Sequence, residues 1–222
     1  MTKKLLWITE TQQDFMTDDQ NYKGLIAVPN AASILTNLEA LTNYARENDA
    51  KILYTGDLHT WQDAEISREP DFVNTFGMHC ERGTYGARFI SQTLPRDPYV
   101  VDFNDEKMNP TRLKEAREIV LYKNHVDIFK GNPYANMVVS TFLKPEKVIH
   151  AGVATNVCVD LAIMGNVERT RKYGGQVYAV TDAMMGLPHL DKTPLATQKV
   201  IQKWEDSGVK LITTKDVLEG RV

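Results

Sequence analysis

The sequence contains few cysteines and no long hydrophobic run. Cys80 and Cys158 are the only cysteines among 222 residues, so disulfides do not staple this fold and each thiol is a candidate reactive group. The apolar runs are a handful of residues long, whereas a membrane-spanning helix needs roughly 20. The first residues, MTKKLLWITE, lack the apolar core and small-residue cleavage site of a signal peptide. We therefore expect a reduced, cytoplasmic protein that does not enter a membrane.

The chain also lacks an excess of charge of one sign. It has 26 basic and 29 acidic residues, which gives a formal net charge of −3. This balance offers no electrostatic attraction for nucleic acid or for an acidic membrane surface. Internal repeats, low-complexity tracts and linkers are absent as well. The sequence thus predicts one domain over residues 1–222, long enough to bury a two-sided sheet without disulfides or metal.

Short apolar runs typical of strands alternate with segments of helical periodicity. This alternation predicts an α/β fold with a mostly parallel sheet covered by helices on both faces. The segment Gly56–Pro98 has no regular pattern, and irregular segments of this length are usually functional or disordered. Its aromatic residues argue against disorder. We predict strands at Lys4–Thr9, Ala50–Thr55, Tyr99–Val101, Ile119–Lys123, Lys147–Ala151, Gln176–Thr181 and Lys210–Thr213, and helices at Asn30–Glu47, Val157–Arg171 and Pro194–Ser207.

Cys158 lies in the run HAGVATNVCVDL, where a predicted strand turns into a predicted helix. At the start of a helix the unpaired N–H groups and the helix dipole favour a thiolate over a thiol. The same N–H groups can bind a tetrahedral oxyanion. A free cysteine is equally often a small buried apolar residue. Both interpretations stay open at this point.

A second set of candidates consists of one carboxylate and two imidazoles. Asp57 and His59 directly follow a predicted strand, and His79 comes twenty residues after His59. Such a set suits a divalent metal ion such as zinc, iron(II) or manganese. Capping of helices and binding to backbone are the alternative roles. A fourth ligand is not evident, since Glu65 and Glu69 in the same loop can simply be solvated.

Glu10 and Lys123 are charged residues that emerge from buried strands. Glu10 follows an apolar N-terminal run. It is either a turn residue or a catalytic acid or base. Lys123 ends the run EIVLYK and either extends to water or stabilises an anion beside it. Because ligand sites in open α/β sheets lie at the carboxyl ends of the strands, we expect Glu10, Lys123 and Cys158 to meet there. Asp14, four residues after Glu10, is interpreted as a turn acceptor.

The remaining candidates carry weaker signals. His125 can line a pocket or lie in a surface loop, and His150 is expected inside a strand as a buried imidazole. His189 is a candidate for a loop over the cleft. Cys80 is interpreted as a packing residue.

Four segments, taken together and in order, resemble one known family. They are ETQQDF, then GDLH with FGMHCERGTYGARF, then KNHVDIF, and finally GVATNVCV. The set resembles the isochorismatase-like cysteine hydrolases, and within them the branch related to nicotinamidases. The likeness covers nearly the whole chain and implies a three-layer α/β/α sandwich.

The resemblance also implies catalytic roles. Cys158 would attack an amide carbonyl and form a thioester, and Glu10 would carry the thiol proton to the departing ammonia. Lys123 would hold both groups in productive charge states. The N–H groups of Ala154 and Cys158 would form the oxyanion hole, and the Val153–Ala154 peptide would be cis.

The metal set gains a specific meaning from the same resemblance. Asp57, His59 and His79 match the nicotinamidase ligands, with zinc as the preferred ion, where the metal binds a ring nitrogen of the substrate. Phe15 matches an aromatic residue that packs on that ring. The implied substrate is a small carboxamide, and the family habit of self-association implies a homo-oligomer.

The chain departs from the family pattern at three places. Glu10 stands where the family has aspartate, Gly77-Met78 replaces a proline-containing approach to the metal histidine, and Arg88 replaces a glutamate. Alternatives therefore stay open: an N-carbamoyl or ureido amidohydrolase, an isochorismatase-type vinyl-ether hydrolase, or a catalytically retired binding protein of the same fold.

Overall fold

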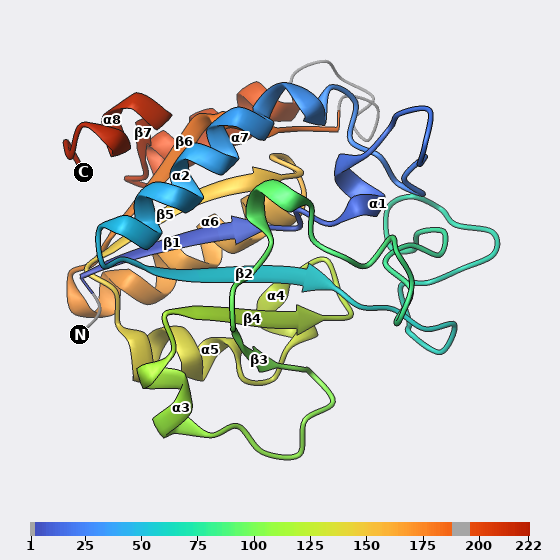
Figure 1. The fold of residues 1–222 in the computed structure, drawn as a ribbon, viewed down its shortest axis with the longest axis horizontal. Helices are drawn as coiled ribbons and strands as arrows, with labels where there is room; N and C mark the ends of the chain where they lie inside the picture. Colours follow the sequence, from blue (N-terminus) through green and yellow to red (C-terminus); the bar gives the residue numbers. More distant parts are fainter. Residues whose placement is uncertain (1–2, 188–195) are drawn as a thin grey trace.

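A seven-stranded parallel sheet runs through the centre of the protein (Figure 1). The structure, a computed structural model, describes residues 3–187 and 196–222. The strand order is β3-β4-β2-β1-β5-β6-β7, and every ladder between described strands is parallel. The strands are β1 Lys4–Thr9, β2 Lys51–Asp57, β3 Tyr99–Val101, β4 Glu118–Lys123, β5 Lys147–Val153, β6 Gln176–Met185 and β7 Lys210–Ile212.

All seven predicted strands are confirmed. The largest differences are at the carboxyl ends, where β2 continues to Asp57, β5 to Val153 and β6 to Met185. The extensions of β2 and β5 stay buried, but Gly56-Asp57 and Gly152 interrupt the apolar pattern that predicts a strand.

The three predicted helices are present, with shifted ends. The first begins as a 3₁₀ turn, Ala31–Ile34, before α2 Leu35–Glu47, and the predicted residues Pro194 and Leu195 lie outside the described part of the chain. Helices of one or two turns were not predicted, because so few residues show no clear period. The helices are α1 Gln13–Met16, α2, α3 Pro110–Glu115, α4 Ile128–Gly131, α5 Ala135–Met137, which continues into a π-helical turn Val138–Leu143, α6 Cys158–Thr170, α7 Ala196–Asp206 and α8 Thr214–Leu218.

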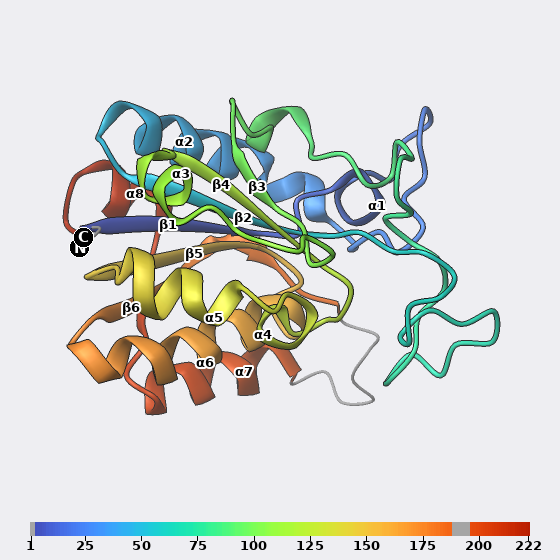
Figure 2. The ribbon, with the colours of Figure 1, turned by 90° about the horizontal axis from the view of Figure 1, so that it is seen from below.

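Helices cover both faces of the sheet, which confirms the three-layer arrangement. α2 and α8 lie on one face, and α4 to α7 lie on the other (Figure 2). Alternate residues of each strand point to opposite faces. Leu6 and Ile8 of β1 accordingly pack in the cluster under α2, whereas Leu5 and Trp7 pack in the cluster under α4 and α5. This two-sided core explains why the strands are nearly continuous in apolar residues.

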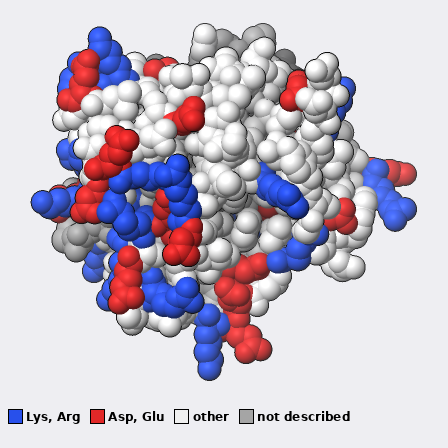
Figure 3. Space-filling model, viewed as in Figure 1, with Lys and Arg blue, Asp and Glu red and all other residues white. Residues whose placement is uncertain are grey.

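The face of the molecule drawn in Figure 3 carries charge of both signs. On the face seen in Figure 3, acidic and basic side chains lie mostly next to one another and do not form separate patches of one sign. In the part of the chain that the structure describes, no helix has the length and hydropathy needed to cross a bilayer.

Four neighbouring strands bring the candidate residues together. β4, β2, β1 and β5 are consecutive in the sheet, and their carboxyl ends face the irregular segment 58–98 (Figure 1). Gly152 near the end of β5 has a φ of 117°, and a Cβ there would lie 2.1 Å from the carbonyl oxygen of Thr9. Only glycine can bring the backbone of β5 this close to Thr9 of β1, the residue directly before Glu10.

Candidate active site

Lys123 lies at the centre of the candidate site. Its side chain is only 1% exposed, and its Nζ forms an ion pair with Asp57 Oδ1. The same Nζ lies 3.5 Å from Glu10 Oε1 and 3.9 Å from Cys158 Sγ. Asp57 and Lys123 are direct register partners in β2 and β4, so the sheet itself sets their pairing. One buried ammonium group is thus shared by two carboxylates and a thiol.

Glu10 turns inward as soon as β1 ends. Its backbone has a φ of 52°, in the left-handed region, and its N–H donates to the carbonyl of Thr55. The side chain is buried, and among the described residues neither carboxylate oxygen has a hydrogen-bond partner. Burial and the charge of Asp57 raise the pKa of Glu10 to about 8, against the opposing effect of Lys123. Once ionised, a carboxylate with this pKa binds a proton more tightly than an ordinary one, and a pKa near the working pH suits general base catalysis.

Cys158 is the first residue of α6, as the sequence predicts, but burial overrides the effect of the helix start. The thiol is buried, and this burial raises its pKa well above the ordinary value, against the lowering effect of Lys123. The expectation of a favoured thiolate is therefore wrong for the protein without substrate. The resting group is a thiol, so its reaction requires a nearby proton acceptor.

The turn before α6 presents backbone N–H groups beside the thiol. The Val153–Ala154 peptide bond is cis, as the resemblance implies. The carbonyl of Ala154 accepts hydrogen bonds from the N–H groups of Val157 and Val159. No backbone carbonyl of the described residues accepts from the N–H of Ala154 or Cys158. These two groups can therefore donate to an oxyanion formed at the thiol.

Asp57, His59 and His79 form a buried cluster whose candidate ligand atoms all lie within 4.8 Å of one another. His79 Nε2 lies 3.5 Å from Asp57 Oδ2, while His79 Nδ1 is hydrogen-bonded to the carbonyl of Gly77. Within the described residues, neither ring nitrogen of His59 has a hydrogen-bond partner. Buried ring nitrogens without partners are costly unless a ligand satisfies them. The residues present therefore fit a divalent metal ion.

Glu65 adds a carboxylate that sequence reasoning left open. It is buried, and its Oε1 lies 3.5 Å from His59 Nε2 with no hydrogen-bond partner in the described part of the chain. Its other oxygen accepts from the N–H of Val126. Glu69, the other acidic residue considered, is exposed. Sequence spacing could not separate the two, because only the fold of the loop brings one of them inward.

A cavity joins the catalytic candidates to the metal cluster. Its empty space, part of which opens to solvent, is about 400 Å³. Phe15 forms one wall and places its ring edge-on to His79 at 5.4 Å between centroids. The long segment 58–98 contributes Phe76 to the wall, and the N-terminal part of the chain contributes Ile26 and Val28, which were not predicted. The lining residues are Glu10, Phe15, Ile26, Val28, Asp57, Phe76, His79, Val126, Ala154, Val157, Cys158 and Leu187.

The other histidines lie away from this cavity or outside the described chain. His125 accepts a hydrogen bond from the N–H of Asp127 and does not line the cavity. His150 is a buried strand residue, as predicted, and burial lowers its pKa to about 3. His189 lies outside the described residues. Cys80 is fully buried, in agreement with a packing role.

The fold is an α/β/α sandwich whose cavity holds a buried cysteine, and the family comparison gives the class of protein. The family model of the isochorismatase domain matches residues 4–216. The chain therefore belongs to the isochorismatase family of hydrolases. No curated protein matches it in sequence.

Solved structures with the same fold are distant in sequence. A pyrazinamidase of Pyrococcus horikoshii in complex with zinc is 21% identical, with a TM-score of 0.70 over 95% of this chain and 99% of that one. A nicotinamidase/pyrazinamidase of Acinetobacter baumanii is 17% identical, with a TM-score of 0.70 over 98% and 99%. An N-carbamoylsarcosine amidase of Thermoplasma acidophilum is 16% identical, with a TM-score of 0.67 over 96% of each chain. At these identities the likeness establishes the fold alone.

Proposed function

We propose that this protein is a metal-assisted cysteine amidase that hydrolyses a small, flat, uncharged carboxamide, with nicotinamide as the first compound to test. One observation carries the proposal. A single cavity is lined by the thiol of Cys158, the carboxylate of Glu10 and two members of the metal cluster, Asp57 and His79. An amide held there by its ring near the metal cluster would place its carbonyl near the thiol.

The acylation step uses three groups of this chain. Glu10 takes the proton from the thiol of Cys158 as Sγ bonds to the amide carbon, and the N–H groups of Ala154 and Cys158 receive the oxyanion. Glu10 then gives its proton to the amide nitrogen, the C–N bond breaks, and ammonia leaves a thioester. Lys123 keeps the thiolate and the carboxylate paired with a positive charge throughout.

Deacylation reverses the proton path. Glu10 removes a proton from a water molecule whose oxygen attacks the thioester carbon, and Cys158 recovers a proton as the C–S bond breaks. The products are one carboxylic acid and one ammonia for each amide and water consumed. The raised pKa of Glu10, about 8, suits a group that must accept and release a proton in each half of the cycle.

Asp57, His59 and His79, with Glu65 beside them, would hold the metal. A divalent ion bound there supplies a Lewis-acidic anchor for a ring nitrogen of the substrate. The zinc complex of the pyrazinamidase with the same fold supports zinc as the ion to test first.

Metal removal should affect nicotinamide much more than benzamide, which has the same shape but no ring nitrogen. We expect chelation to lower kcat/KM for nicotinamide by about 10- to 100-fold relative to benzamide, or about 1.4 to 2.8 kcal/mol for one lost anchor. Ammonia release from both amides, by zinc-loaded and chelated protein, is the measurement. Equal losses for the two amides would contradict the anchoring role, and no turnover of any amide by the zinc-loaded protein would contradict the proposed function.

The pH dependence should report the protonation of Glu10. Because Glu10 must be ionised to accept the thiol proton and its pKa is raised, kcat/KM should rise about tenfold per pH unit on the acidic side and level off above about pH 8. Glu10→Gln should lose about 10²- to 10⁴-fold in kcat/KM, and its kcat/KM should no longer rise with pH on the acidic side, the part of the profile called the acidic limb. Glu10→Asp, which keeps a carboxylate, should retain the limb. An unchanged limb in Glu10→Gln would place the base elsewhere.

The alternatives make different demands on the cavity. N-carbamoyl amino acids and isochorismate carry carboxylates, yet the described lining contains no lysine or arginine to pair with one. This favours an uncharged substrate, and a carbamoyl amino acid in the substrate panel tests the point directly. A retired binding protein would keep Cys158 inert toward iodoacetamide at every pH.

A further inference from the structure

We infer that Asp14 is a positioning residue that holds His79 for metal binding by fixing the peptide that follows it. This inference rests on the metal cluster of the proposed function. Asp14 lies in α1 and is 1% exposed, which is unusual for a carboxylate that pairs with no lysine or arginine of the described residues. Its carboxylate accepts hydrogen bonds from two separate segments, residues 22–25 and the peptide that follows His79.

The carboxylate of Asp14 contacts the peptide that follows His79 and a residue next to the cavity wall. Oδ2 accepts from the N–H of Cys80 at 2.6 Å, and that N–H belongs to the peptide joining His79 to Cys80. Oδ1 accepts from the Tyr22 hydroxyl at 2.5 Å and from the N–H of Leu25 at 3.1 Å. Leu25 directly precedes Ile26, a residue of the cavity wall. The carboxylate of Asp14 therefore links the cavity wall to the peptide that follows His79.

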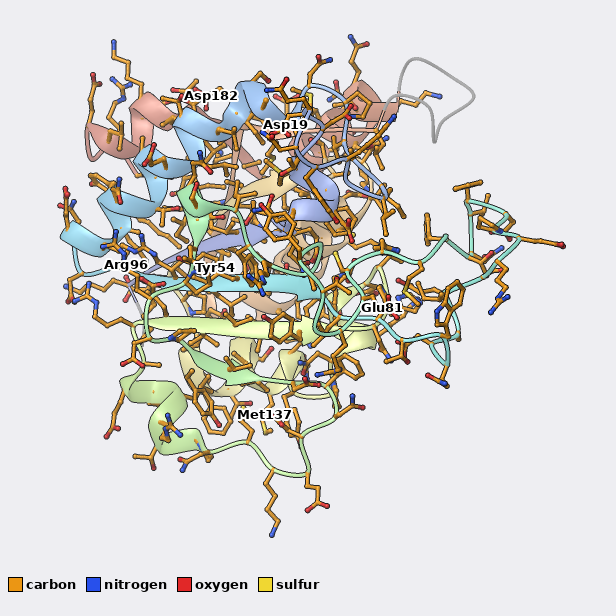
Figure 4. The ribbon with its side chains drawn as sticks, turned by 45° about the vertical axis from the view of Figure 1, so that its right-hand side comes forward. Asp19, Tyr54, Glu81, Arg96, Met137 and Asp182 are labelled. Atoms are coloured by element: carbon orange, nitrogen blue, oxygen red, sulfur yellow. The ribbon has the colours of Figure 1, made fainter. Side chains whose placement is uncertain are left out.

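Cys80 occupies a conformation that needs support. Its φ is 43°, in the left-handed region that residues with a side chain rarely adopt. Its carbonyl accepts from the N–H of His59, and an isolated parallel bridge pairs His59 with Glu81, which Figure 4 labels beyond the carboxyl end of β2. The backbone of Cys80 thus connects the two metal histidines, and Asp14 holds its remaining polar group.

The fit around the carboxylate leaves it little freedom. A Cβ at Gly86 would lie 2.2 Å from Asp14 Oδ2, so the main chain of Gly86 packs directly on the charge. The N–H of Asp14 also donates to the carbonyl of Gly86. Hydrogen-bonded groups that orient a metal ligand typically change metal affinity by 10- to 100-fold when removed. This is the effect expected at Asp14.

The test compares two substitutions on the two sides of the same carboxylate. Asparagine at position 14 fills the same space, but it is uncharged and has a single acceptor oxygen. The N–H groups of Cys80 and Leu25 each need an acceptor oxygen, on opposite sides of the side chain. We expect Asp14→Asn to weaken zinc binding, measured by competition with a chelator, by about 10-fold or more. Tyr22→Phe removes only a bond on the other oxygen and should bind zinc within about twofold of the wild type. Equal zinc affinity in Asp14→Asn and the wild type would overturn the inference and leave the proposed function intact.

A measurement on the wild type covers the case in which Asp14→Asn does not fold. Amide hydrogen exchange at Cys80 should be slow in the metal-free protein, because the bond to Asp14 exists before the ion binds. Exchange at the rate of an exposed loop would overturn the inference. A wild-type protein that binds no zinc would overturn both the inference and the metal-anchoring part of the proposed function.

Discussion

Cys158→Ala is expected to abolish amide hydrolysis, with a loss of roughly 10⁴-fold or more in kcat. In the proposed route this thiol forms the covalent bond to the carbonyl carbon, and no step of the route avoids it. Cys158 is buried at the first residue of α6, and replacing its sulfur with hydrogen removes little volume. The free energy of unfolding should therefore change by about 1 kcal/mol or less.

Two measurements distinguish the loss of the nucleophile from a loss of the folded protein. Ammonia release gives the rate, and mass spectrometry of protein quenched during turnover should reveal a thioester adduct on the wild type and none on Cys158→Ala. Residual turnover above about 1% of the wild-type rate in the variant would mean that another group is the nucleophile.

Lys123→Met is expected to damage both activity and stability. It removes the ammonium group that lies between Glu10, Asp57 and Cys158, and the buried Asp57 loses the partner that most lowers its pKa. Breaking a buried ion pair in this way costs about 3–5 kcal/mol. We expect a loss of roughly 10³-fold in kcat/KM, because the variant no longer stabilises the thiolate.

The stability loss in Lys123→Met should grow with pH. Burial alone would raise the pKa of Asp57, but Lys123 and the two histidines hold it well below its ordinary value of 3.8. In the wild type this carboxylate therefore adds stability above pH 3.8, and the stability is lost as the pH falls through the lower folded pKa. Without Lys123 the folded pKa rises, so the folded variant binds protons that the unfolded chain has released. Urea unfolding should show a larger difference between variant and wild type at pH 8 than at pH 5.

A control lysine separates this effect from the general cost of losing a charge. Lys203 pairs with Asp160 near the surface, and its side chain is 45% exposed. Lys203→Met should change stability by about 1 kcal/mol or less, since exposed ion pairs contribute little. Comparable losses in Lys203→Met and Lys123→Met would contradict the central role assigned to Lys123.

Much of the fold could be predicted from local pattern. The apolar runs fix the strands because each must be buried on both faces, and the prediction failed mainly at strand ends and at very short helices. The periodicity of the sequence does not predict the order of the strands in the sheet, since any apolar run of this composition can pair with any other. That order decides that β4, β2, β1 and β5 are neighbours and that Glu10, Asp57, Lys123 and Cys158 meet.

By itself, the sequence determined which groups could carry the chemistry: a thiol at a helix start, a carboxylate and a lysine at strand ends, and one acid with two histidines. Tertiary structure alone decided their charge states and partners, because these depend on burial and on distances between segments far apart in the chain. Burial makes the Cys158 group a thiol and raises the pKa of Glu10. The folding of the long loop turns Glu65 inward, and two segments donate hydrogen bonds to Asp14, which the sequence presents as an ordinary turn acceptor.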